Sequence, residues 1–78
     1  MAWKKYEDCE RPEITVYIQR NDNGGYDIDK YEEDVLVDFI LDVKPEDPGG
    51  FEWEEMVSIA EAQLDVALDE TPIDGSPM

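Results

Sequence analysis

The fold is decided by the stretch Glu13-Ile-Thr-Val-Tyr-Ile-Gln-Arg20-Asn-Asp-Asn-Gly-Gly25-Tyr-Asp-Ile-Asp29. In its first half, apolar and polar residues alternate with the period of two that is typical of a strand with one buried face. The Asn and Gly residues of 21–25 readily take the positive φ angles that a tight hairpin requires, and the alternation resumes at Tyr26. This stretch therefore predicts a β-hairpin with strands at about 13–20 and 26–31.

A third strand is predicted at about 34–43, where β-branched residues are frequent and every odd position is apolar. The positions that would face the core are Val35, Val37, Phe39, Leu41 and Val43. Residues 44–50 follow as a loop, because two prolines and two glycines interrupt both a strand and a helix there.

The period changes to that of a helix at about 51–70. The stripe that would cover the sheet consists of Trp53, Val57, Ala60, Leu64, Ala67 and Leu68. We therefore expect a small two-layer α+β domain at 13–70, with a β-hairpin and a third antiparallel strand covered by one C-terminal helix. Residues 1–12 are expected to form an N-terminal arm, and residues 71–78 a flexible tail.

The charge is strongly negative and unevenly distributed. The 78 residues include 22 Asp and Glu against 6 Lys and Arg, a formal net charge of −16. Residues 1–20 are neutral, so all of the net charge follows Arg20. Such a chain is repelled by phosphate backbones and by anionic lipids, which disfavours direct binding of nucleic acid or of a membrane. The expected partner is a basic protein surface.

A candidate acidic site lies along one side of the predicted helix. Its members are Glu54, Glu61, Asp65 and Asp69, with Asp38 and Asp42 on the third strand as further partner-binding acids. Residues four apart on a helix are about 6 Å apart along its axis, which resembles the spacing of successive phosphates on a nucleic-acid strand. The acids could thus imitate nucleic acid towards a protein that normally binds it. The alternative is that they only keep a small domain soluble.

A second candidate surface consists of apolar residues that the predicted core does not use. They are Leu36, Ile40, Ile59 and Val66. A single helix on a three-stranded sheet leaves one sheet face and one helix face uncovered, so these residues favour a homodimer or a docked partner. Alternatively, the N-terminal segment with Trp3 and Tyr6 folds over one of these faces.

Catalytic, cofactor and metal sites are not predicted. The chain has no His, and Cys9 is its single cysteine, which excludes an internal disulfide and favours a reducing, cytoplasmic setting. The first residues show no apolar leader segment after Lys4 and Lys5. Residues 21–32 resemble a calcium-binding loop only superficially, because Tyr26 stands where such a loop needs glycine.

In size, acidity and compact α+β pattern, the chain is similar to the small acidic inhibitors that phages and mobile elements encode, including anti-restriction and anti-CRISPR proteins. The likeness is one of composition and contains no shared motif, so no residue roles are carried over. It implies a non-enzymatic protein that occupies a basic surface of a nucleic-acid-binding protein, within the host cytoplasm if phage-encoded. The alternative function is a small assembly module that oligomerises or docks through its apolar faces.

Overall fold

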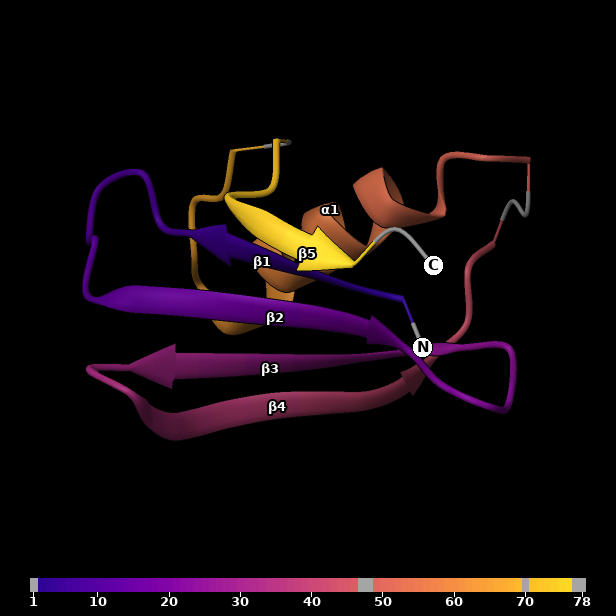
Figure 1. The fold of residues 1–78 in the computed structure, drawn as a ribbon, viewed down its shortest axis with the longest axis horizontal. Coiled ribbons are helices and arrows are strands. Elements are labelled where there is room, and N and C mark those ends of the chain that lie inside the picture. Colours follow the sequence, from indigo (N-terminus) through magenta and orange to yellow (C-terminus); the bar gives the residue numbers. More distant parts are fainter. Residues whose placement is uncertain (1, 47–48, 70, 77–78) are drawn as a thin grey trace.

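The computed structural model describes residues 2–46, 49–69 and 71–76. Within these residues it shows one five-stranded antiparallel sheet, in the order β4-β3-β2-β1-β5, with one helix packed on it (Figure 1). The elements are β1 (Trp3–Glu7), β2 (Ile14–Arg20), β3 (Tyr26–Glu32), β4 (Val35–Val43), α1 (Glu52–Leu64) and β5 (Asp74–Ser76). The predicted α+β class is confirmed. The prediction of three strands is wrong, because the sheet has five.

The predicted hairpin is formed by β2 and β3, and all seven residues of each strand are paired. Its loop is organised by the side chain of Asn21, whose Oδ1 accepts hydrogen bonds from the backbone N–H groups of Asn23 (2.9 Å) and Gly25 (3.0 Å). Gly24 has a φ of +79°, the left-handed conformation that glycine adopts without strain. The loop and the buried faces of the two strands therefore favour the same register.

The two strands that the sequence did not predict lie at one side of the sheet. The expected N-terminal arm contains β1, which pairs with β2 and directs Tyr6 into the core. The expected flexible tail contains β5, which pairs with β1. A Cβ atom at Gly75 would lie only 2.6 Å from the carbonyl oxygen of Trp3, so glycine is what allows β5 to approach so closely.

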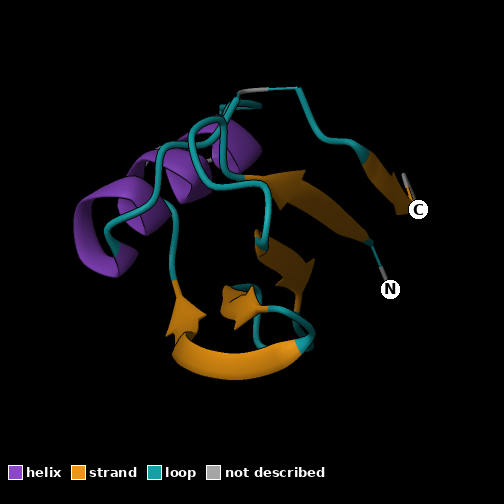
Figure 2. Ribbon diagram, turned by 90° about the vertical axis from the view of Figure 1, so that its left-hand side faces the viewer, coloured by secondary structure: helices purple, strands orange, loops and turns teal. Residues whose placement is uncertain are grey.

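The core lies between one face of the sheet and α1 (Figure 2). Its sheet side chains come from alternate positions of β1, β2 and β3, as the period of two requires. The buried residues of the sheet are Tyr6, Ile14, Val16, Ile18, Tyr26 and Ile28, and those of α1 are Met56, Val57, Ala60 and Leu64. Among the described residues, no helix is long and apolar enough to cross a membrane.

The helix ends at Leu64 and not near residue 70 as predicted. Asp65 adopts a left-handed conformation with a φ of +53°, and residues 66–69, the returning segment, then run back along the sheet. This reversal buries both Val66 and Leu68. A continued helix would have turned Val66 away from the sheet. Full burial of one such side chain is worth about 1.5–3 kcal/mol, which favours the reversal over another helical turn.

Strand β4 departs from the simple alternation on which its prediction was based. Its pairing with β3 contains two register shifts, and Asp42 has a φ of +55°. Each irregularity of this kind adds one residue to one strand, so that the side chains after it point to the opposite face of the sheet from the one that simple alternation predicts. Ile40 and Val43 consequently pack on the core. The predicted core residues that are instead exposed are Val35, Val37, Phe39 and Leu41.

Candidate functional site

The acids predicted to share one side of a helix are separated by the structure. Glu54 and Glu61 lie on α1 with exposed side chains, whereas Asp65 follows the last helical residue and Asp69 lies in the returning segment. The regular, helix-spaced ridge of acids therefore does not form. A role for each of these residues in binding a partner stays a prediction.

Three of these acids also act within the molecule, and Asp69 does so through its Oδ1, which accepts a hydrogen bond from the backbone N–H of Thr71 at 3.2 Å. The carboxylate of Glu61 accepts a hydrogen bond from the backbone N–H of Leu68 at 3.1 Å, which ties the returning segment to α1. Burial, with a further contribution from the charge of Glu54, raises the pKa of Tyr6 to about 12. Glu61 is therefore unsuitable for a charge-reversal test of binding, because its substitution also affects the fold.

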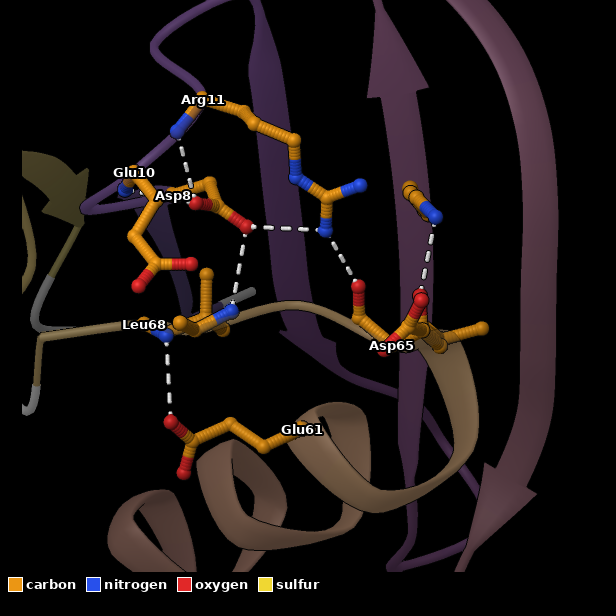
Figure 3. Close-up of polar contacts among 9 residues, drawn as sticks. Asp8, Glu10, Arg11, Glu61, Asp65 and Leu68 are labelled. Carbon is orange, nitrogen blue, oxygen red and sulfur yellow. Dashed lines mark hydrogen bonds and ion pairs between the residues drawn. The ribbon is translucent and has the colours of Figure 1, made fainter.

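A buried carboxylate, Asp8, organises the end of β1 (Figure 3). Its Oδ1 accepts backbone hydrogen bonds from Glu10 (2.8 Å) and Arg11 (2.9 Å), and its Oδ2 accepts one from Ala67 (3.0 Å). The guanidinium of Arg11 lies 3.5 Å from the same Oδ2. Burial by itself raises the pKa of Asp8, but the three N–H donors and Arg11 outweigh it, so the net pKa is lowered.

The same region satisfies the C-terminal end of α1. The last turn of the helix contains no basic residue of its own. Instead, Lys30 Nζ donates to the carbonyl oxygen of Leu64 (2.9 Å), and Arg11 Nη2 donates to that of Asp65 (2.5 Å). Cations at this end complement the helix dipole and the unpaired carbonyl groups. Sequence reasoning missed this arrangement, because only the local turn after Asp8 is visible in the sequence.

All six basic residues are engaged within the molecule. Lys4 and Lys5 lie over aromatic rings, and Arg11, Arg20, Lys30 and Lys44 donate hydrogen bonds. Among the described residues only two ion pairs form, Asp8 with Arg11 and Asp42 with Lys44. Most described carboxylates therefore have no cationic partner in the molecule.

The four apolar residues proposed for a second contact do not share one exposed face. Leu36 is exposed, but Ile40 and Ile59 pack against the core, and Val66 is buried. Most of the large apolar side chains that are exposed in the described residues lie instead on β4, which is an edge strand of the sheet, and the other two are Phe51 and Ile73. Those on β4 are Val35, Leu36, Val37, Phe39 and Leu41. Apart from Leu36, this group, the β4 apolar strip, was not predicted, because the irregular pairing of β4 cannot be deduced from alternation.

The two predicted acids of β4 are both exposed, but they differ in their contacts. Asp42 Oδ1 accepts from Lys44 Nζ at 2.9 Å and from the Asn21 side chain at 3.1 Å, and these two bonds lower the pKa of Asp42. Among the residues that the structure describes, Asp38 Oδ1 accepts only from the backbone N–H of Phe39, at 2.8 Å. The charge of Asp38 is therefore available to a partner, whereas that of Asp42 is already paired.

A hollow of about 450 Å³ lies on the sheet face opposite the core. Its lining includes Trp3 and Lys5 of β1, Tyr17 of β2, Asp29 and Tyr31 of β3, and Asp34 of the turn before β4. The Trp3 and Tyr17 rings are 6.2 Å apart between centroids, and the Tyr17 and Tyr31 rings 5.4 Å. Sequence reasoning did not identify this hollow, because it requires β1 beside β2.

Asp29 is the half-buried acid of the hollow. Among the described residues, no hydrogen bond or ion pair is made by its carboxylate, whereas the neighbouring Asp27 accepts from the Asn21 side chain at 3.1 Å and from the backbone N–H of Asp42 at 2.9 Å. Burial, and then the charge of Asp27, raise the pKa of Asp29. The ionised carboxylate is therefore destabilised where it lies, and a cation placed beside it would relieve this.

A metal centre is not assembled by the described part of the chain, where no group of three or more acidic or cysteine side chains is placed to hold an ion. Cys9 is exposed and forms no disulfide. The loop at Asn21–Gly25 uses its asparagine side chain to organise its own backbone.

Comparison with known protein families, with curated proteins and with solved structures finds no match to this chain.

Proposed function

We propose that this protein is a non-enzymatic acidic binding protein that occupies a basic surface of another protein, of the kind that nucleic-acid-binding proteins carry. The single observation that carries the proposal is the engagement of every basic residue within the molecule. With a net charge of −16 and only two internal ion pairs in the described residues, the acids have their complementary charges outside the chain. A basic partner supplies them and is attracted over a long range.

The surface around β4 supports the proposal better than the helix does. The β4 apolar strip offers area that can be buried, and Asp34 and Asp38 beside it offer exposed charges. An apolar centre with a polar rim is the usual composition of a protein interface. Because negatively charged side chains flank the strip, its complement on a partner is an apolar patch surrounded by lysine or arginine.

The test combines capture of the partner with charge reversal at two places. The partner is captured and identified at about 50 mM salt, and its affinity is then measured up to about 500 mM, where exposed charges are strongly screened. We expect Asp38→Lys to weaken binding by about tenfold or more, and Glu54→Lys on α1 to weaken it less. The two variants change the net charge equally, so Glu54→Lys is the matched control.

The role of the partner is tested by competition. If the captured protein binds nucleic acid, the acidic protein should displace a labelled oligonucleotide from it, and displacement should fall steeply with salt. Binding that is unchanged by salt and by both substitutions contradicts the proposal. Equal losses of affinity from the two substitutions would agree with a basic partner but would exclude β4 as the surface that contacts it.

Assembly through the β4 apolar strip is the second candidate function. It is favoured by the exposed fractions of Phe39 and Leu41, which are 53 % and 60 %. A two-fold pairing of β4 with itself centred on Asp38 would place like charges opposite one another, which is destabilising. Self-assembly would therefore strengthen as salt rises, whereas binding to a basic partner weakens. Sedimentation velocity at low and high salt distinguishes the two functions.

A further inference from the structure

The hollow on the open face of the sheet has features that the proposed function does not require. Its three rings, those of Trp3, Tyr17 and Tyr31, form a continuous row across β1, β2 and β3. All three side chains are only partly buried, and α1 covers the opposite face of the sheet. Aromatic side chains provide large contact areas with few rotatable bonds, so a row of partly exposed rings is well suited to binding.

The two ends of the hollow have opposite charge. At one end Lys5 Nζ lies 5.6 Å from the centre of the Tyr17 ring. At the other end, Tyr31 lies with the carboxylates of Asp29 and Asp34, and no cation of the described residues pairs with either acid. A ligand group beside Tyr31 therefore meets an aromatic ring and two negative charges, while the positive charge of Lys5 stands at the far end.

We propose that the end of the hollow formed by Asp29, Tyr31 and Asp34 binds the guanidinium group of an arginine presented by the basic partner. The inference rests on the proposed function and names the side chain that is recognised. A guanidinium can stack on an aromatic ring and donate parallel hydrogen bonds to a carboxylate, whereas an ammonium is a point charge with neither property. Its charge also compensates the half-buried Asp29, which has no partner of its own.

Three rings of the protein already lie against cations of its own, one of them a guanidinium. Lys4 lies 4.7 Å from the centre of the Trp53 ring, and Lys5 and Arg20 each lie 5.6 Å from the centre of a tyrosine ring. Cations over ring faces at such distances are attracted by the ring quadrupole. Tyr31 has no such cation among the described residues, so its ring remains available to one from outside. The hollow of about 450 Å³ is large enough for a side chain.

The experiment is a nuclear magnetic resonance titration with three blocked pentapeptides that carry arginine, lysine or citrulline between glycines. Citrulline is the neutral isostere of arginine, so it tests the charge at constant shape. We expect the arginine peptide to shift the aromatic resonances of Tyr31 and Tyr17, the lysine peptide to bind more weakly, and the citrulline peptide to cause no shift at the hollow.

Two substitutions separate this site from general charge attraction. Asp29→Asn should lower the affinity for the arginine peptide by about fivefold or more, and Tyr31→Leu should do the same. Asp22→Asn, in the exposed loop between β2 and β3, changes the net charge as Asp29→Asn does but should weaken binding by less than about twofold. Asp34→Asn serves as a second charge variant, and circular dichroism shows that each variant is folded.

The outcomes distinguish the site from the proposed function. Equal effects of Asp29→Asn and Asp22→Asn, or equal binding of the arginine and citrulline peptides, overturn the site while binding to a basic partner stands. Resonance shifts spread over the whole surface, with none concentrated at Tyr31, also overturn the site. If hexa-arginine fails to bind the wild-type protein at low salt, the proposed function itself is overturned.

Discussion

Replacement of Asp8 should destabilise the protein more than replacement of any exposed acid. The carboxylate is buried and accepts three backbone hydrogen bonds of 2.8–3.0 Å, besides its contact with Arg11. A hydrogen bond to a charged group contributes about 1.5–3 kcal/mol, but water can replace Asp8 at the more exposed N–H groups. We therefore expect Asp8→Ala to cost about 3–5 kcal/mol. A domain of 78 residues has a free energy of unfolding of only about 4–12 kcal/mol.

A milder variant keeps the measurement within range. Asp8→Asn retains one oxygen that can accept from Glu10 and Arg11, but its amide group meets the N–H of Ala67, which is also a donor. We expect it to cost about 2 kcal/mol at pH 7. The assay is urea unfolding followed by tryptophan fluorescence, in which a shift of the midpoint at constant slope reports the loss of stability.

The cost of Asp8→Asn should also depend on pH. Because the folded-state pKa of Asp8 lies below its ordinary value of 3.8, the stabilisation by Asp8 is fully present above that value and is lost as the pH falls through the folded pKa. The difference between wild type and Asp8→Asn should therefore be constant near neutral pH and shrink below about pH 4. An equal stability of the two proteins at pH 7, or a difference that persists unchanged into acid, would refute the reasoning.

Three further sets of substitutions test other parts of the structure. Asp29→Asn should stabilise the protein slightly at pH 7, and the gain in urea unfolding should disappear as the pH falls through the raised folded pKa of Asp29 and the wild-type carboxylate takes up its proton. In the turn between β3 and β4, Glu33 and Asp34 have φ angles of +51° and +68°. The double substitution Glu33→Asn with Asp34→Gly should therefore raise the free energy of unfolding by about 1 kcal/mol. An unchanged midpoint of urea unfolding would contradict strain at this turn. Ile40→Ala should lower the free energy of unfolding by about 2–4 kcal/mol and Phe39→Ala by less than about 1.5 kcal/mol, since only Ile40 of the two packs on the core. The reverse order of the two losses would mean that Phe39 faces the core, as simple alternation along β4 predicts.

What the sequence reveals about the fold depends on how local each determinant is. The β2–β3 hairpin could be predicted because its alternation and its loop residues lie within one short stretch. Strands β1 and β5 have too few apolar residues to be recognised from the sequence. β1 pairs with the next strand, β2, whereas β5 forms only because it pairs with β1 at the far end of the sequence. The helix end depends on Lys30 and Arg11, which lie on distant segments.

The candidate sites follow the same rule. The net charge and its absence from residues 1–20 could be read directly from the sequence. The predicted ridge of acids does not form, because its spacing requires a helix that continues past Leu64, and the helix ends there. The β4 apolar strip and the hollow depend on strand irregularities and on the position of β1, which no periodicity in a single segment indicates.

The pairing of β1 with β5 has a consequence for synthesis and for engineering. Trp3 lies opposite Ser76, so one edge of the sheet is built from the earliest and the latest of the described residues to leave the ribosome. While the chain is being made, β1 can pair only with β2, and the edge is completed after release of the last strand. A tag inserted directly before β1 or directly after β5 would lie near this edge, across the sheet from β4. A circular permutant that joins the end of β5 to the start of β1 and opens the chain between β4 and α1 should therefore keep β4 accessible.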